Sequence, residues 1–398
     1  MKLDRLHIRN IRNIQDIEIT CARGIHFIYG LNAQGKTSIL ESIYLLSNLR
    51  SFRDSDLSAL LKQGQEFSVV NGKFKLDPTT QAELKVELVQ GPRRFEKRAY
   101  INGKLTRSSL DYFGVKLNHS AVQFHAINLN PTSTDLIRGE PSLRRNYLNQ
   151  VVSSESLDYM HALKVYQKAL DQKNALLKAE EKFDLALFNI LNETLVKTGA
   201  ILLHGRLNYL RKLSKPVLDF LSNIAPLQRP VNLVYRNGET LHFTGHFDPP
   251  SVNFLEENLH QKLTEMRTQE RVRKSSLVGP HRDDLMFKVG DVVGNSNSPL
   301  LPDLVNVGSQ GEIRSLLLSL KLAELEAFKA QTRIQPVLLI DDFSSELDST
   351  RRGFLLNYLK NSELQIFVTS TDDLSGNLGA TGTVIEMQHG SVKERSGT

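Results

Sequence analysis

The chain contains 398 residues, of which 40% are hydrophobic and 24% charged, and this composition excludes a disordered or fibrous protein. A single cysteine, Cys21, excludes an internal disulfide and a cysteine-based zinc site, and neither a membrane span nor a signal peptide is indicated, so we expect a cytoplasmic protein. The formal net charge of +6 favours polyanionic partners, although charge alone does not establish one.

The N-terminal fifty residues show two kinds of apolar periodicity. Residues 1–20 nearly alternate in hydrophobicity, which predicts two short strands joined near Arg12 and Asn13. Residues 25–29 form a continuous apolar run typical of a buried strand, and residues 38–49 carry apolar side chains at helical spacing. A glycine-containing loop therefore lies between a predicted strand and a predicted helix.

This loop carries a phosphate-binding motif, because it fits the pattern G-x-x-x-x-G-K-[ST] at every defined position. In such a loop the backbone amides turn toward a β-phosphate, Lys36 neutralises the β and γ oxygens, and the Thr37 hydroxyl coordinates Mg²⁺. A chance match in a turn is the alternative, and the flanking strand and helix argue against it. We predict that the nucleotide is bound by Gly30, Leu31, Asn32, Ala33, Gln34, Gly35, Lys36, Thr37 and Ser38.

The segment after the first helix returns to strand periodicity. Hydrophobicity alternates from residue 67 to residue 105, with Asn71-Gly72 and Asn102-Gly103 as predicted hairpin turns or bulges. This pattern indicates an antiparallel sheet beside the phosphate loop.

The middle of the chain is predicted to be a helical arm. Residues 152–222 have apolar side chains at helical spacing, which favours two antiparallel helices. The second, over residues 183–213, would be about 45 Å long unless Gly199 or Gly205 interrupts it. A third helix over residues 255–274 would return the chain to an α/β pattern.

An acidic strand follows in the C-terminal part. Residues 336–340 are apolar and end in Asp341 and Asp342, the arrangement that holds a hydrated Mg²⁺ through the first carboxylate. Asp342 would then face the attacking water. A core strand that ends in a solvated acidic pair is the alternative, and the phosphate loop argues against it.

A possible anion site precedes this strand. Residues 307–312 open a helical run over residues 313–328 and place Ser309, Gln310 and Gly311 at its N-terminus. An ordinary helix N-cap is the alternative interpretation.

Two further polar positions depend on their context. Asp348 ends the segment S-E-L-D, which follows the acidic strand at the spacing of a dimer-contact loop. Gln123 follows the antiparallel region at a position from which a glutamine could reach Mg²⁺, although a lone glutamine is usually a surface residue.

The order of these segments resembles the ABC-type ATPase heads of the SMC group. Several motifs more narrowly resemble the RecF family of bacterial recombination mediators, and the resemblance spans nearly the whole chain. The arm also lacks the long coiled coil of SMC proteins. The motifs are residues 35–37 (GKT), 40–46 (LESIYLL), 51–53 (SFR), 139–145 (GEPSLRR), 279–284 (GPHRDD), 309–311 (SQG) and 341–348 (DDFSSELD).

The resemblance implies an α/β fold: an ABC-type P-loop ATPase head with an antiparallel β subdomain and an inserted helical arm, or lid. We expect residues 1–150 and 276–398 to form the two parts of the head and residues 151–275 to form the arm. It also implies an ATP- and Mg²⁺-dependent homodimer that clamps double-stranded or gapped DNA. The implied biological task is recombinational repair and replication, in which the family helps RecA onto DNA with RecR and RecO.

The resemblance also assigns roles to single residues. Lys36, Gln123 and Asp342 would be catalytic, and the Mg²⁺ ligands would be Thr37, Asp341 and Gln123. The nucleotide-binding site of one chain would be completed in trans by residues of the other chain, namely Ser309, Gln310 and Gly311. Asp348 would also contact the nucleotide.

Two departures from the family qualify this expectation. The segment His125-Ala126-Ile127-Asn128 and Asn149 differ from the usual family residues. The first of these follows Gln123, so the expected role of that glutamine as a switch is affected. After the strand over residues 365–368 stands Thr369 rather than the histidine of transporter-type ATPases, so we expect hydrolysis to be slow.

Basic residues suggest where DNA binds. Because no base-reading motif occurs, contact with the phosphate backbone is the expected mode. Solvated basic faces on a mildly basic protein are the alternative. The predicted DNA-binding residues are Arg50, Arg53, Arg93, Arg94, Lys97 and Arg98.

Other functions remain open at this stage. ATP could set only the conformation of a non-catalytic scaffold, or the chain could be another SMC-type head. A subunit that powers a membrane transporter is less consistent with the helical insertion and the basic strands.

Overall fold

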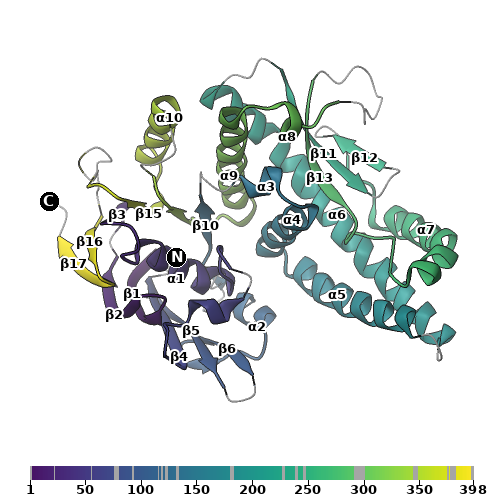
Figure 1. Cartoon of the computed structure of the whole chain (residues 1–398), viewed down its shortest axis with the longest axis horizontal. Coiled ribbons are helices and arrows are strands. Elements are labelled where there is room, and N and C mark those ends of the chain that lie inside the picture. Colours follow the sequence, from purple (N-terminus) through teal and green to yellow (C-terminus); the bar gives the residue numbers. More distant parts are fainter. Residues whose placement is uncertain are drawn as a thin grey trace. The chain divides into compact units, whose positions relative to one another are not determined.

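The computed structural model divides the chain into two compact units (Figure 1), Met1–Thr132 with Phe328–Thr398 (unit 1) and Ser133–Ala327 (unit 2). These limits differ from the expected ones at residues 150 and 275. Segments before and after the helical arm pack with it in unit 2, as described below. The described residues are 2–21, 23–54, 56–75, 80–91, 94–114, 116–117, 120–121, 124–130, 134–179, 183–225, 229–237, 241–244, 248–290, 301–343, 348–373, 376 and 382–395.

A mixed sheet forms the nucleotide side of unit 1. Its strand order is β10-β14-β15-β3-β16-β17, and all neighbours are parallel except β16 and β17. The parallel strands are almost entirely apolar because both faces of this sheet are covered. Its strands are β3 (Ile25–Tyr29), β10 (Ala126–Leu129), β14 (Val337–Ile340), β15 (Gln365–Ser370), β16 (Val384–Gln388) and β17 (Ser391–Arg395).

The second sheet of unit 1 is antiparallel, with the order β2-β1-β4-β5-β6-β7. This confirms the two N-terminal strands and the sheet predicted from the alternation over residues 67–105. The alternating burial along each strand follows from one face packing on the core. The strands are β1 (Lys2–Ile11), β2 (Ile14–Thr20), β4 (Phe67–Lys75), β5 (Gln81–Gln90), β6 (Phe95–Ile101) and β7 (Lys104–Leu105).

One of the two predicted turns in this sheet is correct. Asn102 and Gly103 connect β6 to β7, and both have positive φ angles, 49° and 76°. The turn predicted at Asn71-Gly72 is wrong, because both residues lie inside β4. Gly72 is needed there for space, since an added Cβ would lie 2.7 Å from the Phe74 ring.

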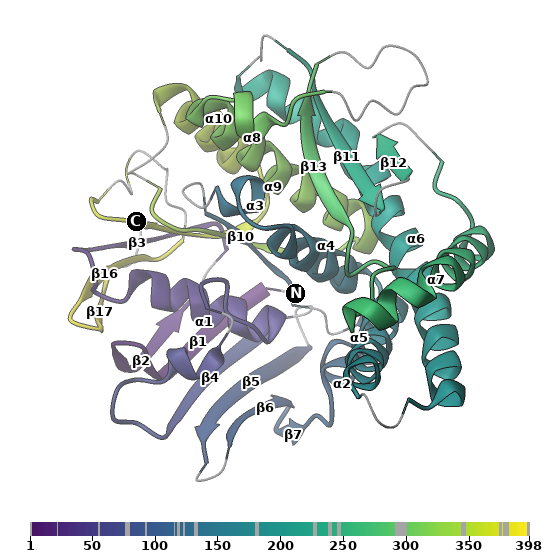
Figure 2. The ribbon, with the colours of Figure 1, turned by 45° about the vertical axis from the view of Figure 1, so that its right-hand side comes forward.

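Helix α1 (Lys36–Asn48) contacts strands of both sheets and is almost entirely buried between them (Figure 2). Its apolar side chains join those of the two sheets in one core that includes Ile39, Ile43 and Leu46. The smaller elements of unit 1 are η1 (Leu57–Leu60), α2 (Ser109–Phe113), β8 (Lys116–Leu117), β9 (Ser120–Ala121) and α10 (Ser349–Lys360).

Unit 2 combines a helical arm with a three-stranded antiparallel sheet of order β12-β11-β13. Helix α6 packs between α5 and α7, which confirms the predicted antiparallel arm (Figure 1). The elements are α3 (Asp135–Arg138), α4 (Pro141–Glu155), α5 (Leu157–Lys178), α6 (Leu185–Ile224), β11 (Val231–Asn237), β12 (Leu241–Thr244), α7 (Val252–Arg273), β13 (Asp284–Val289), α8 (Leu304–Val307) and α9 (Gln310–Thr332), whose end lies in unit 1.

Helix α6 runs without interruption for 40 residues, so neither Gly199 nor Gly205 breaks it. Both glycines lie at close helix contacts. A Cβ at Gly205 would lie 2.7 Å from the ring of Tyr159, and one at Gly199 would lie 3.2 Å from Leu259.

By length and composition, α6 is also the one helix among the described residues that could cross a membrane, although the sequence had indicated none. Its buried apolar residues form the core of unit 2 with α5 and α7.

Two of the sequence motifs meet in unit 2. Arg144, in the segment GEPSLRR, donates two hydrogen bonds of 2.8 and 2.9 Å to the carboxylate of Asp284, in the segment GPHRDD. Arg145 donates to the carbonyl of Asp283 at 2.9 Å. These contacts join α4 to β13, which explains why segments on both sides of the arm belong to unit 2.

Arg206 connects the arm to the same region. Its side chain is 2% exposed and donates to the hydroxyls of Tyr159 and Tyr235 at 3.1 and 3.0 Å. It also donates to the Pro280 carbonyl and to Asn149 Oδ1, both at 2.8 Å. Asn149, which departs from the family pattern, thus serves as a neutral acceptor for a buried guanidinium.

Candidate nucleotide-binding site

The phosphate loop connects the C-terminal end of β3 to the N-terminus of α1, as predicted. Gly30 and Gly35 adopt φ angles of 147° and 102°, which side chains other than glycine rarely tolerate. The space is also restricted, because a Cβ at Gly30 would overlap with the Met387 carbonyl and one at Gly35 would lie 2.9 Å from Asn13 Oδ1. The two glycines of the motif are therefore required by backbone geometry and by packing.

Lys36 folds back over this loop. Its Nζ donates to the carbonyls of Gly30 and Leu31 at 2.6 and 2.9 Å. Burial lowers the pKa of Lys36, and the nearby carboxylates of Asp342 and Asp341 oppose that shift. The ammonium group is thus placed at the mouth of the loop, close to where the motif binds phosphate oxygens.

Thr37 and Asp341 bring the loop and the acidic strand together. The Thr37 hydroxyl donates to Asp341 Oδ1 at 2.9 Å, although 304 positions separate them in the sequence. The hydroxyl of Thr369, on the neighbouring strand β15, donates to the same oxygen at 2.8 Å and accepts from the backbone N–H of Asp342 at 2.8 Å. Asp342 itself has a left-handed backbone conformation, with φ of 52°.

The arrangement fits a magnesium ion. Thr37 and Asp341 supply a hydroxyl and a carboxylate, the hard oxygen ligands that Mg²⁺ prefers. Among the described residues no group of three or more His, Cys, Asp or Glu side chains could hold a metal.

Sequence reasoning did not find the residues that support the loop. Asn13, in the turn between β1 and β2, donates to the Ala33 carbonyl at 2.8 Å and accepts from Ser38 Oγ at 3.4 Å. These contacts bring together segments far apart in the sequence, so local periodicity could not indicate them.

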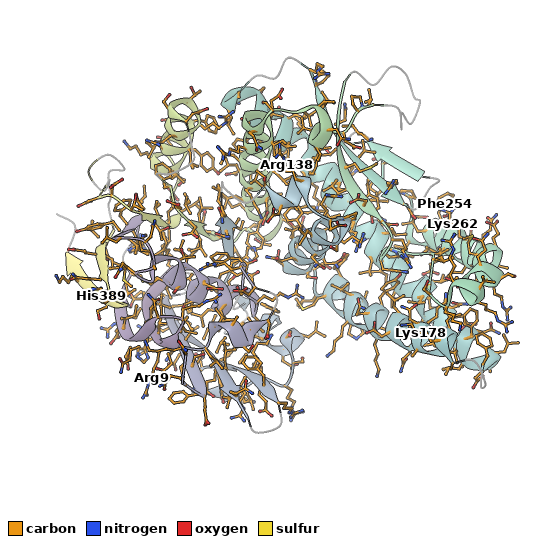
Figure 3. The ribbon with its side chains drawn as sticks, in the orientation of Figure 1. Arg9, Arg138, Lys178, Phe254, Lys262 and His389 are labelled. Carbon is orange, nitrogen blue, oxygen red and sulfur yellow. The ribbon has the colours of Figure 1, made fainter. Side chains whose placement is uncertain are left out.

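The turn between β16 and β17 supports the loop as well. His389, labelled in Figure 3, donates its backbone N–H to Gln34 Oε1. Gly390 donates its N–H to the Gln34 carbonyl at 3.2 Å. Gln34 is therefore held by the C-terminal hairpin.

Ser309, the first residue of the segment 309–311 (SQG) and here called part of the signature segment, caps α9. Ser309 Oγ accepts from the N–H of Glu312 at 3.2 Å, and Glu312 Oε2 accepts from the N–H of Ser309 at 2.7 Å. This reciprocal pair is a capping box, so the N-cap interpretation holds for unit 2 by itself. Ser309 and Gln310 remain exposed to solvent.

Asp348 also caps a helix. Its Oδ1 accepts from the Arg351 N–H at 2.9 Å at the start of α10, and its carboxylate pairs with the Arg351 guanidinium. Gln123 and residues 345–347 of the S-E-L-D segment lie outside the described residues.

Comparison with known proteins places this site in a family. The chain matches the family described as RecF/RecN/SMC N terminal domain over residues 2–393. A curated relative from Geotalea uraniireducens, named DNA replication and repair protein RecF, is 33% identical over 371 residues, which are 93% of each chain. A relative of the same name from Lacticaseibacillus paracasei is 33% identical and covers 98% of this chain and 99% of its own. The chain belongs to the RecF family.

Solved structures agree with this family. Two are described as the recombination mediator protein RecF in the RecFOR pathway, one with ATP and one with ATPrS. Their TM-scores are 0.84 and 0.83, and each is 30% identical and covers 99% of this chain. An Smc head domain from Pyrococcus furiosus, with a TM-score of 0.53 and 14% identity, shares the fold alone. The expected α/β ATPase head is thereby confirmed.

The predicted DNA-binding residues of this family member do not form one surface. Arg94, which precedes β6, and Arg98 on β6 both pair with Glu96, each at 2.9 Å. Lys97 projects to the opposite face of the strand, as the twofold alternation requires. Arg93 lies outside the described residues.

A second group of cations lies at the end of α1. Lys97 Nζ donates to the Leu49 carbonyl at 2.9 Å. Desolvation of the ammonium group lowers the pKa of Lys97, and the positive charge of Arg50 lowers it further. Arg50 and Arg53 are both exposed to solvent. The structure thus associates Lys97 with Arg50 rather than with Arg94 and Arg98.

The outer face of the antiparallel sheet carries compensated charge. Arg5 pairs with Glu18 at 3.7 Å, and Arg9 lies 4.0 Å from Asp16. Arg9, labelled in Figure 3, also lies over the Phe67 ring at 5.2 Å. This face is therefore a weaker candidate for DNA than the group at the end of α1.

Proposed function

We propose that this chain is an ATP-dependent DNA-binding protein of recombinational repair and replication. The observation that carries the proposal is the 2.9 Å bond between Thr37 and Asp341, because it joins the phosphate loop to the acidic strand. The full-length similarity to ATP-bound RecF structures supports ATP as the nucleotide.

Each residue of the site has a chemical task in this proposal. Lys36 exchanges its bonds to the loop carbonyls for oxygens of the β- and γ-phosphates. Thr37 and Asp341 would hold Mg²⁺, which neutralises charge that develops on the transferred phosphoryl group. Asp342 orients the attacking water. It lies just after the end of β14, where the Thr369 hydroxyl holds its backbone N–H.

Hydrolysis is expected to be slow. Residues 371–373, directly after β15, include no histidine, and the hydroxyl of Thr369 is already bonded to Asp341. Thr369 therefore positions the acidic pair. A slow ATPase suits a protein in which ATP mainly sets a conformational state.

The nucleotide would join two copies of the chain. In this arrangement Ser309, Gln310 and Gly311 of one chain complete the site formed by the phosphate loop of the other. The exposed position of Ser309 and Gln310 is compatible with such a contact. Glu312 occupies the Ser309 N–H, so the γ-phosphate would compete with this carboxylate.

Backbone phosphates of duplex or gapped DNA would bind the cations at the end of α1, and RecR, RecO and RecA would be partners by family membership. The affinity should fall with salt at a log-log slope of about −0.9 for each phosphate neutralised. Charge reversal at Arg50 should flatten that slope for all sequences alike. Reversal at Arg94, which shares the Glu96 carboxylate with Arg98, should change the slope less.

One set of measurements tests the proposal. Molecular mass, duplex binding and ATP turnover are compared with ADP, ATP and a non-hydrolysable analogue. We expect a dimer that retains duplex with ATP or the analogue, a weaker complex with ADP, and turnover that rises with DNA. A dimer that binds DNA with ATP but shows no turnover would favour the non-catalytic scaffold. A mass and a DNA affinity independent of nucleotide would overturn the proposal.

A further inference from the structure

An ionic cluster centred on the buried side chain of Glu41 lies next to the phosphate loop in unit 1. We call it the Glu41 cluster, and it comprises Arg12, Glu41, Ser51 and Asp54. The Glu41 side chain is fully buried and accepts from Arg12 Nε and Nη2 at 3.1 and 3.0 Å. Glu41 also accepts from the Ser51 hydroxyl. Arg12 Nη2 donates to the Asp54 carboxylate as well as to Glu41.

The cluster is linked to the nucleotide site through the backbone at two places. Glu41 is on α1 four residues after Thr37, so it lies one helical turn below the proposed Mg²⁺ ligand on the same side of the helix. Arg12 precedes Asn13, which holds the Ala33 carbonyl in the phosphate loop. A displacement of the cluster would therefore move residues that position the loop.

On its other side, the cluster fixes the exposed segment after α1. The Ser51 hydroxyl accepts from the N–H groups of Arg53 and Asp54 at 2.9 and 3.0 Å. This small turn holds Arg53, and Arg50 lies immediately before it beside Lys97. Residues 51–54 are thus anchored at both ends, because Ser51 bonds to Glu41 and Asp54 bonds to Arg12.

Stability alone is a weak explanation for such a cluster. A buried ion pair must recover the cost of desolvating two charges, and hydrophobic residues of similar volume would often stabilise the fold as well or better. Asp54 is moreover 42% exposed in its side chain, so the Arg12–Asp54 pair reaches the surface beside the cations. This geometry fits a role in positioning the segment.

We propose that the Glu41 cluster is a positioning device, through which DNA phosphates bound at Arg50 and Arg53 influence the phosphate loop and so ATP turnover. The inference rests on the proposed function. In it, Arg12, Glu41 and Asp54 touch neither substrate nor DNA and act through the residues that they hold.

The test compares Asp54→Asn with Asp56→Asn. Both variants remove one negative charge from the same segment, but among the described residues the hydrogen bonds of the Asp56 carboxylate come from the backbone and hydroxyl of Ser58, at 2.9 and 2.6 Å. Basal ATP turnover, turnover with saturating duplex, duplex affinity and thermal stability are measured for each variant and for the wild type.

An effect of charge alone and positioning by the Glu41 cluster predict opposite results. If charge alone matters, both variants bind duplex more tightly and are stimulated at least as strongly as the wild type. If the cluster positions the segment, Asp54→Asn retains its basal turnover but loses about threefold or more of the stimulation by DNA, while Asp56→Asn retains it. Ser51→Ala, which removes the acceptor of the Arg53 N–H, should behave like Asp54→Asn.

The possible failures are distinguishable. Equal stimulation of Asp54→Asn and Asp56→Asn, with a wild type that responds to DNA, overturns this inference and leaves the proposed function intact. A wild-type turnover that DNA does not change overturns the inference alone, whereas a mass and a DNA affinity independent of nucleotide overturn the proposed function and the inference with it.

Discussion

At the scale of single residues, Asp341 is the point where the site is assembled. Its Oδ1 accepts from hydroxyls on two different elements, Thr37 on α1 and Thr369 on β15. Because both donors are held by packed elements, the carboxylate orientation is fixed before any substrate binds. Within the described part of the chain no group donates a hydrogen bond to the Asp342 carboxylate, and its backbone N–H donates to the Thr369 hydroxyl.

The first prediction concerns Asp342. Asp342→Asn should still bind ATP, because Lys36, Thr37 and Asp341 are unchanged, but turnover should fall by about a hundredfold or more. The variant should also remain on DNA longer than the wild type. Turnover and the rate of dissociation from duplex are measured with Asp372→Asn, which removes an exposed acid after β15, as the control. Faster release from DNA than the wild type would contradict the assignment.

The residues predicted from the sequence are those in local motifs. Lys36, Thr37 and Asp341 belong to short segments whose chemistry is readable from residue type and spacing. Asn13 and the turn at His389 contribute through contacts with the loop that only the folded chain creates. Single-sequence patterns carry no signal for such contacts, so they were missed.

At the scale of elements, close packing explains why α6 is continuous. A glycine in an exposed helix interior costs about 1 kcal/mol relative to alanine, but at Gly205 the Tyr159 ring occupies the space of a side chain. The periodicity of the sequence predicted the helix and its partner α5. It could not indicate whether the glycines break the helix or admit a neighbour, because that depends on tertiary contacts.

The second prediction follows from this packing. Gly205→Ala should destabilise unit 2 by about 1 to 3 kcal/mol, because the added methyl group is forced against Tyr159. Gly353→Ala is the matched control, since a Cβ there meets nothing within 4 Å in helix α10. This control should stabilise unit 1 by about 0.5 to 1 kcal/mol. Urea unfolding measures both changes, and a stabilising Gly205→Ala would refute the packing argument.

The third prediction concerns the pH dependence of stability. Burial raises the pKa of Glu155 on α4 to about 7 from its ordinary value of 4.5, with a lowering effect from Lys212 and a raising effect from Glu324. As the pH rises above 4.5, the unfolded carboxyl loses its proton before the folded one does, so stability falls until the pH passes about 7.

Glu155→Gln should remove this loss. The variant should match the wild type near pH 5 and exceed it at pH 8 by an amount on the order of 2 kcal/mol. Urea unfolding across this range is the measurement, with Glu257→Gln on the exposed side of α7 as the control. A parallel decline of the wild type and Glu155→Gln would contradict the assignment to Glu155.

At the scale of the whole molecule, the sequence predicted the components better than their grouping. The head and the family were identified from motifs and the arm from helical periodicity, and the match over residues 2–393 confirms the family. The limits of the compact units lie instead at residues 132 and 327, because Arg144 and Asp284 join segments that flank the arm. Contacts between distant segments decide such limits, and periodicity does not encode them.

The central claim is that two chains share each nucleotide site, and complementation between two inactive variants tests it most directly. Lys36→Ala removes the phosphate-binding ammonium group of its own loop. Ser309→Arg leaves that loop intact but places a bulky cation at the N-terminus of α9 and disrupts the capping box with Glu312. Each homodimer should therefore lack ATPase activity, because every site contains one lesion.

In a mixed dimer both lesions fall in one site. The other site combines the intact phosphate loop of the Ser309→Arg chain with the intact segment 309–311 of the Lys36→Ala chain. Equal mixing with random pairing makes half of the dimers mixed, each with one good site of two, so DNA-dependent turnover should recover to about a quarter of the wild-type value. Full activity of Ser309→Arg alone, or no recovery from variants that demonstrably pair and retain ATP, would contradict the shared site.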